Sequence, residues 1–195
     1  LGGLVGLLAP FGYNPTDIAN ALWASTRAMI KNDGTLTNEE RFWQSFSEIL
    51  GEGVKGYEKE LDEFYKTEFQ KVSAVCNPTP KTRELIDLVK GSDLRVILAT
   101  SPLFPAVATE SRIRWAGLTP DDFEHYTTYE NSIYCKPNPL YYKKLLEELS
   151  LSPEEGVMIG NDGGDERGAE SLGIKCFLLT DGRSNRKGEE RTKDT

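Results

Sequence analysis

Hydroxyl side chains follow the apolar run at residues 96–99, where Thr100 and Ser101 stand next to each other. A short run of this kind is typical of a buried parallel strand, and ligands of open α/β sheets bind outside the carboxyl ends of such strands. A hydroxyl at that place, together with backbone amides of the following turn, can donate to the oxygens of a phosphoryl group. An ordinary turn cap is the alternative, since Thr and Ser are common in turns.

A lysine, Lys136, comes just before a helix whose start is set by Pro137 and Pro139. The N-terminus of a helix favours negative neighbours, so a lysine there suits the binding of an anion. A solvated surface lysine is the alternative. Cys135, beside it, would be a nucleophile only with a lowered pKa, and the single histidine, His125, is not close to it in the sequence.

Acidic side chains follow the apolar run at residues 157–159, in the glycine-rich string GNDGGDE at residues 160–166. Carboxylates this close repel one another unless a cation or a basic group lies between them. Mg²⁺ suits such a loop, because it binds carboxylates, waters and substrate phosphate together. In the alternative interpretation, Asp165 and Glu166 only stabilise the N-terminus of the next helix.

The elements that would position these residues alternate between strands and helices. Buried strands are predicted over residues 96–100, 157–160 and 176–179, with a weaker strand near 123–129, and helices over 105–115 and 139–149. This alternation is typical of the α/β class, with a parallel sheet flanked by helices.

The first 73 residues show helical patterns and no convincing strand. A capping cluster at residues 14–17 precedes Ile18, Leu22, Ser25 and Met29 at helical spacing, and Thr37 with Glu40 can form a capping box before the next helix. A third helix is predicted over residues 57–69. The sequence therefore predicts a helical domain over residues 1–76 and an α/β domain over residues 77–195.

Taken together, a hydroxyl, then a lysine, then an acidic loop, each at a strand end or helix start, resemble the haloacid dehalogenase (HAD) superfamily of phosphohydrolases. The resemblance covers roughly residues 79–180, and the helical first part is similar to the helical cap of that family. It implies a HAD-like Rossmannoid core, in which helices flank a parallel sheet, together with an all-helical cap.

The same resemblance assigns roles to the residues singled out above. It implies that Thr100, or less favourably Ser101, binds the phosphoryl group, and that Lys136 stabilises its charge. It implies that Asp162 and Asp165 hold Mg²⁺, with Asn161 at what would be the first acidic position of the family's motif. An amide at that position leaves open which side chain contacts the metal, and it keeps a metal-independent dehalogenase as an alternative.

The nucleophile of the family, an aspartate in a DxDxT motif after the first strand, has no counterpart in the sequence. The string DGTL at residues 33–36 resembles the end of that motif, but Lys31 stands where the nucleophile belongs, after a helical pattern. Because the chain starts with Leu1, we expect the first strand and its aspartate upstream of it. Without them we expect the chain to be inactive, to expose apolar strand edges and to aggregate.

The function expected from this resemblance is a Mg²⁺-dependent hydrolase of a small phosphorylated metabolite, working through an aspartyl-phosphate. Two alternatives stay open: a metal-independent, dehalogenase-like hydrolase, and a catalytically inactive relative that serves as a binding or scaffold protein.

Composition argues against several other classes. The 195 residues carry a formal net charge of −8, which disfavours nucleic acid or an anionic membrane as the partner. The three cysteines, Cys76, Cys135 and Cys176, are far apart and form no CxxC pair, so we expect reduced thiols. No apolar stretch reaches the length that a membrane span requires. A cytoplasmic protein is the resulting expectation.

Overall fold

The computed structural model describes residues 2–179 of the chain. The chain divides into two compact units, Leu1–Cys135 and Lys136–Thr195, called here the N-terminal unit and the C-terminal unit. The cap and core domains expected over residues 1–76 and 77–195 stay a prediction.

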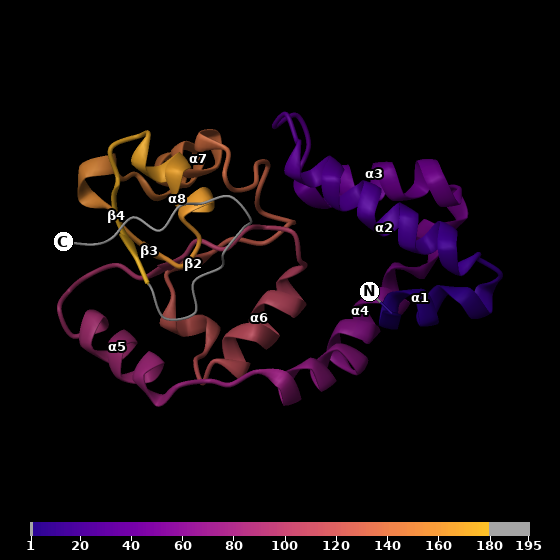
Figure 1. The fold of residues 1–195 in the computed structure, drawn as a ribbon, viewed down its shortest axis with the longest axis horizontal. Coiled ribbons are helices and arrows are strands. Elements are labelled where there is room, and N and C mark those ends of the chain that lie inside the picture. The colour runs from indigo at the N-terminus through magenta and orange to yellow at the C-terminus, as the bar shows by residue number, and fades with distance from the viewer. Residues whose placement is uncertain (1, 180–195) are drawn as a thin grey trace. The chain divides into compact units, whose positions relative to one another are not determined.

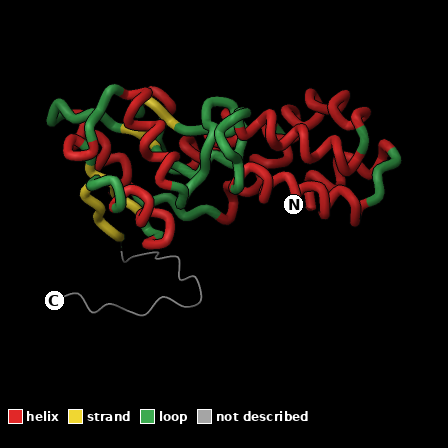
Figure 2. Tube along the Cα trace, turned by 90° about the horizontal axis from the view of Figure 1, so that it is seen from above, coloured by secondary structure: helices red, strands yellow, loops and turns green. Residues whose placement is uncertain are grey.

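The N-terminal unit is mainly helical (Figures 1 and 2). Its α-helices are α1 (Gly2–Leu8), α2 (Pro15–Ile30), α3 (Asn38–Leu50), α4 (Glu58–Lys66), α5 (Pro80–Lys90) and α6 (Ala106–Trp115). Short 3-10 helices span Ala9–Phe11, Glu52–Tyr57, Glu68–Val75 and Pro120–Asp122. As predicted, the described residues that precede the first strand contain helices and loops but no strand.

The starts of α2 and α3 are fixed by the caps that the sequence predicts. The side chain of Asn14 accepts a hydrogen bond from the backbone N–H of Thr16 at 2.9 Å. In the capping box of α3, the Glu40 N–H donates to Thr37 Oγ1 at 3.1 Å, and the Thr37 N–H donates to Glu40 Oε2 at 2.8 Å. Each such cap stabilises a helix by about 1 kcal/mol.

Helices α2 and α3 lie side by side and contribute most of the core of this unit (Figure 1). The side chains at the predicted helical spacing on α2 are all buried: Ile18, Leu22, Ser25 and Met29. Ile18 and Leu22 form one hydrophobic cluster with the fully buried Phe46 of α3 and with Leu8, Ala21 and Val54. The helical spacing predicted for these residues of α2 is therefore confirmed, since all four lie on its buried face.

Two short strands follow in the same unit. Strand β1 (Ile97–Leu98) pairs in parallel with β2 (His125–Tyr126), so that Ile97 lies opposite His125. Both strands lie within the predicted segments and are half-buried.

The C-terminal unit contains α7 (Pro139–Leu149), β3 (Val157–Gly160), α8 (Gly163–Glu170) and β4 (Lys175–Leu178), with a 3-10 turn at Pro153–Glu155. Strands β3 and β4 are parallel, with Ile159 opposite Phe177. The helix α7 has the predicted bounds, β3 matches its predicted range, and β4 is shifted by one residue. The α/β class with parallel pairing is thus confirmed.

The burial predicted for the strands is wrong for β3 and β4. The register places Val157, Ile159 and Phe177 on one face of the pair, and all three are exposed, Ile159 by 52% and Phe177 by 51%. Helix α8 packs against both strands, and Met158 and Cys176, which alternate to the opposite face, are half-buried. Among the described residues the two strands pair only with each other. Lys175 shares the face of Val157, Ile159 and Phe177, with its Nζ atom 5.1 Å from the centre of the Phe177 ring, and the three apolar side chains stay exposed.

No helix within residues 2–179 combines the length and the apolar character needed to cross a membrane.

The uncovered face of β3 and β4 predicts self-association of this chain, because exposed apolar strands pair or stack with other chains. We expect the chain to form larger species with increasing concentration in sedimentation velocity, and the double variant Ile159→Thr, Phe177→Thr to shift this distribution toward the monomer. Ile49→Thr, at an equally half-exposed position on α3, is the control and should change nothing. Equal behaviour of both variants would contradict the assignment of this face.

Candidate functional site

The C-terminal unit holds a buried pair of opposite charges. The Nζ atom of Lys136 lies 3.5 Å from Oε1 of Glu166, and both side chains are only 7% exposed. The Nζ atom also lies 5.5 Å from the centre of the Tyr142 ring, over its face. Lys136 is therefore a buried cation that pairs with the Glu166 carboxylate and lies over the Tyr142 ring, and the surface-lysine alternative is contradicted.

Burial governs the protonation of this lysine. Loss of solvent lowers the pKa of Lys136 below its ordinary value of 10.5, and the carboxylates of Glu166 and Asp165 oppose this shift without cancelling it. The net direction means that the charged form of Lys136 is less stable in the protein than in water. A bound anion would raise the pKa of Lys136, because it adds a further negative charge where little solvent screens the interaction.

Two helix starts position the pair. The side chain of Asn138 caps α7 by accepting from the Leu140 N–H at 3.0 Å, directly after Lys136. Asp162 caps α8 by accepting from the Gly164 N–H at 3.0 Å, which sets Glu166 in the first turn of that helix. The Tyr142 hydroxyl donates to the carbonyl oxygen of Asp165 at 2.9 Å and joins the two helices.

Small residues let these elements approach closely. A Cβ atom at Gly168 would overlap the carbonyl oxygen of Pro137, and it would come within 3.0 Å of the Tyr142 ring. A Cβ atom at Gly160, the last residue of β3, would overlap the Glu166 carboxylate. The glycines at these two positions therefore allow the lysine and the acidic loop to lie against each other.

The predicted metal ligands lie in the same unit, at the carboxyl end of β3. Asn161 is exposed, Asp165 is half-buried, and Asp162 is buried at 8% exposure. Within residues 2–179 no three His, Cys, Asp or Glu side chains come together as a metal site. Mg²⁺ commonly takes only one or two protein carboxylates beside waters and substrate phosphate, so the hard oxygen donors of Asp162 and Asp165 suit that ion.

Glu166 is a residue that the sequence prediction does not include in the site. Its Oε2 atom is buried and has no hydrogen-bond partner in the described part of the chain. An unpaired buried carboxylate oxygen is costly, so it marks a place where a donor or a cation would be stabilised. The sequence places Glu166 in the acidic string, but it gives no signal that separates Glu166 from Asp165 as the partner of Lys136.

The predicted phosphoryl-binding hydroxyls belong to the N-terminal unit. Thr100 is half-buried just after β1, and its carbonyl accepts from the Thr127 hydroxyl at 2.7 Å. The Ser101 carbonyl accepts from the Leu103 N–H at 2.9 Å, which forms a turn. The buried amide of Asn38 donates to the Pro102 carbonyl at 3.2 Å and fixes the loop from the side of α3.

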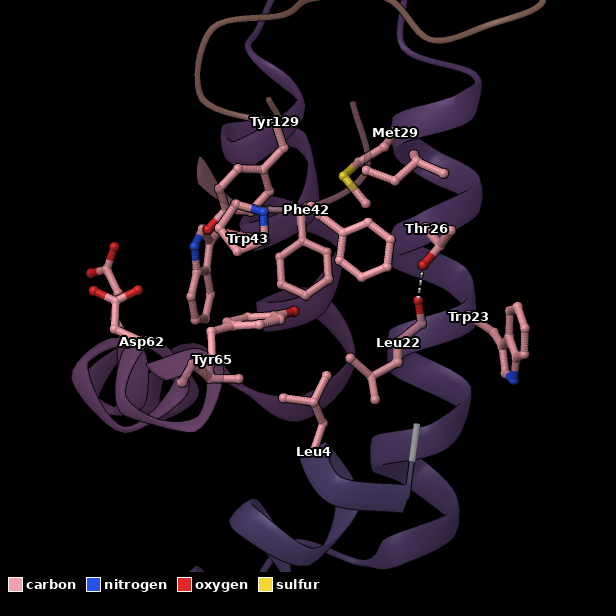
Figure 3. A pocket seen from close by; sticks show the side chains of 15 residues that line it. Leu4, Leu22, Trp23, Thr26, Met29, Phe42, Trp43, Asp62, Tyr65 and Tyr129 are labelled. Carbon is pink, nitrogen blue, oxygen red and sulfur yellow. Dashed lines mark hydrogen bonds between the residues drawn. The ribbon is translucent and has the colours of Figure 1, made fainter. Parts of the chain in front are cut away.

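A cavity of about 290 Å³ lies in the same unit, between α1, α2, α3 and α4 and the loop at residues 103–105. Figure 3 shows Phe42, Tyr65, Tyr129 and Met29 facing one another across it. The Thr26 hydroxyl at its side donates to the Leu22 carbonyl at 2.8 Å and is engaged within its helix (Figure 3). The wall is mainly aromatic and aliphatic.

Cys135 and the string DGTL at residues 33–36 are not part of a candidate active site. Burial raises the pKa of Cys135 to about 12, despite a hydrogen bond from Asn38, so its thiol stays protonated and the nucleophile alternative is contradicted. Helix α2 ends at Ile30 before the string DGTL, as predicted. There Asp33 pairs with Arg41 at 2.9 Å in an exposed loop. The described cysteines are free, as expected.

The buried pair predicts a large difference between two similar substitutions. Glu166→Gln leaves the Lys136 charge without its partner, and we expect a loss of about 3 kcal/mol in the free energy of unfolding. The matched control is Glu148→Gln, which breaks an exposed pair with Lys144 at 3.6 Å, where the expected cost is below about 1 kcal/mol. Urea unfolding measures the loss in the free energy of unfolding for both variants. Equal losses would show that the Lys136 pair is not desolvated.

The close approach at Gly168 predicts that Gly168→Ala destabilises the protein by about 1–3 kcal/mol through overpacking. Gly6→Ala in α1 is the control, because a Cβ atom there meets no other atom within 4 Å, and the gain in helix propensity should stabilise by up to about 1 kcal/mol. We expect the two substitutions to change the free energy of unfolding, measured with urea, in opposite directions. A neutral Gly168→Ala variant would contradict the packing of α8 on the loop that follows Lys136.

Similarity to solved structures supports the α/β fold. A haloacid dehalogenase family enzyme from Bacteroides thetaiotaomicron, in complex with magnesium and inorganic phosphate, matches 97% of this chain and 88% of its own at 16% identity, with a TM-score of 0.53. A haloacid dehalogenase-like hydrolase from Bacteroides fragilis matches 94% of this chain and 82% of its own at 18% identity, with a TM-score of 0.53. At these identities the likeness concerns the fold.

Similarity in sequence points the same way. A phospholysine phosphohistidine inorganic pyrophosphate phosphatase from Xenopus laevis is 40% identical over 75 residues, which are 36% of this chain and 28% of that protein. The match thus spans well under half of the curated relative. Residues 15–173 match the haloacid dehalogenase-like hydrolase family. Since this range covers most of the chain, the protein belongs to the haloacid dehalogenase-like hydrolases.

Proposed function

We propose that this chain is part of a Mg²⁺-dependent phosphomonoester hydrolase that acts on a small phosphorylated metabolite. The observation that carries the proposal is the buried Lys136, whose charge burial disfavours. A phosphoryl group is the anion that such a lysine, at the start of a helix, is suited to bind. The Xenopus laevis relative, named as a phosphatase, supports the same class.

In this proposal the side chains divide the work as follows. Lys136 neutralises charge on the transferring phosphoryl group, and Glu166 holds the ammonium in position. The Thr100 hydroxyl donates to a phosphoryl oxygen, with Ser101 as the neighbouring candidate. Reactions of this class depend on positioning and charge neutralisation, which is why a single buried lysine has a large effect.

Asp162 and Asp165 would hold Mg²⁺, with Asn161 next to them at the end of β3. When bound, the ion neutralises charge on the phosphoryl oxygens and orients them. The carboxylate oxygens of Asp162 and Asp165 support this assignment, because Mg²⁺ prefers hard oxygen ligands. Asp165 is half-buried.

This proposal requires an aspartate as the nucleophile, which residues 1–195 do not supply in a DxDxT motif. Its carboxylate oxygen attacks phosphorus, the bond to the ester oxygen breaks, and an acid two residues further on protonates the departing alcohol. Water then cleaves the aspartyl-phosphate, which returns the carboxylate and releases inorganic phosphate. The chain itself, with no DxD string, is expected to be inactive alone.

The test is turnover of p-nitrophenyl phosphate by the full-length gene product. We expect Mg²⁺-dependent activity, with a kcat for Lys136→Met that is lower by about 100-fold or more. Lys144→Met, at an exposed pair on α7, is the control and should retain full activity. Circular dichroism of both variants verifies that they fold.

Three results would contradict the proposal. Near-normal turnover by a folded Lys136→Met variant would remove the assigned role of the lysine. Activity that is unaffected by EDTA would favour the metal-independent alternative. A full-length product with no aspartate before Leu1 and no turnover would favour the inactive, phosphate-binding relative.

A further inference from the structure

The cavity of the N-terminal unit has the size and the lining of a site for a small hydrophobic molecule. Its volume is about 290 Å³, whereas an apolar cavity of ~150 Å³ is enough to bind benzene. The rings of Phe42, Tyr65 and Tyr129 form much of its wall, as Figure 3 shows. One aromatic ring with a short side chain would therefore fit.

The charges at the cavity have one sign. Glu58 and Asp62 of α4 are the charged residues that line it, and within residues 2–179 no lysine or arginine does. Figure 3 shows Asp62 on α4 at the side of the cavity where Trp43 lies. Nearby, the pKa of Glu39 is raised by its own burial and by the carboxylates of Glu130, Glu58 and Asp62. A cation is attracted by this field and by the aromatic faces, and an anion is repelled.

A buried donor in the wall of the cavity is unsatisfied. The Nε1 atom of Trp43 is out of solvent and has no hydrogen-bond partner among the described residues, although Trp43 lines the cavity. Indole N–H groups that are buried normally find an acceptor. An oxygen atom on a bound molecule would supply it, and this observation is independent of the charges on α4.

The cavity also reaches the loop that follows the predicted phosphoryl-binding hydroxyl. Leu103, Phe104 and Pro105 form part of its wall, and Thr100 precedes them by only a few residues. The Glu130 carboxylate accepts from the Ala106 N–H at 2.8 Å and holds the start of α6 at the end of this loop. A molecule in the cavity would thus contact the same loop that begins with Thr100.

We propose that this cavity is a binding site for a small hydrophobic molecule that carries an ammonium charge and an oxygen acceptor. The inference stands apart from the proposed phosphatase function, because all residues that line the cavity belong to the N-terminal unit. Molecules that carry a carboxylate are disfavoured by the carboxylates of Glu58 and Asp62.

The test uses three probes with the same phenyl and hydroxyl groups and different charge: 2-amino-1-phenylethanol, 1-phenylethanol and mandelate. Isothermal titration calorimetry with this chain should give the tightest binding for the amine, by about ten-fold over 1-phenylethanol, or ~1.4 kcal/mol. Mandelate should bind most weakly. Binding of mandelate as tight as that of the amine, or no binding of any probe, would overturn the inference.

Variants of the cavity wall then test which residues cause the preference for the amine. The double variant Glu58→Gln, Asp62→Asn should lose the preference for the amine and keep the affinity for 1-phenylethanol. Both carboxylates are exposed, so the fold should tolerate the change. Glu63→Gln, also on α4 but outside the cavity wall, is the control and should leave all three affinities unchanged. An amine preference that survives the double variant would contradict the assignment.

The binding assay tests this inference, and the turnover assay tests the proposed function, so that each can be contradicted without the other. Phosphomonoesterase activity without any amine preference would overturn this inference and leave the proposed function in place. An amine preference without phosphatase activity would overturn the proposed function and leave this inference in place.

Discussion

The charge of Lys136 lies almost entirely out of solvent, and the C-terminal unit is arranged around that constraint. One carboxylate, Glu166, faces it at 3.5 Å. The loop after Lys136 and the first turn of α8 can come this close because Gly160 and Gly168 leave room where a Cβ atom would collide. A buried ion pair of this kind adds little stability compared with apolar residues of the same size. The lowered pKa of Lys136 agrees with this, and it points to a use of the charge other than folding.

The N-terminal unit satisfies a different requirement, which is to enclose an apolar space with aromatic side chains. Ile18, Leu22 and Phe46 pack the core between α2 and α3, while rings such as Phe42 border the cavity instead of filling it. A hydrogen bond from Asn38 to the Pro102 carbonyl fixes the loop after β1. The helical walls of the cavity are therefore held by the same packing that stabilises the helices.

Local signals in the sequence were sufficient for much of the fold. The capping box of Thr37 and Glu40, the proline at the start of α7 and the short apolar runs predict their elements closely, because each signal acts within a few residues. Burial of Ile159 and Phe177 was predicted wrongly, since it depends on what covers a strand and not on the composition of the strand. The contact between Lys136 and Glu166 joins residues far apart in the chain, and no local pattern distinguishes Glu166 from Asp165 as the partner.

The most direct test of this account is the pKa of Lys136 itself, measured by NMR on protein with isotope-labelled lysine side chains, first alone and then with orthovanadate and Mg²⁺. Lys136→Arg assigns the signal. We expect a pKa below the ordinary value of 10.5 in the free protein, and a rise in this pKa when the phosphate analogue binds, since a further anion stabilises the charged form. An ordinary pKa that does not respond to orthovanadate would show that Lys136 is neither desolvated nor in contact with the anion.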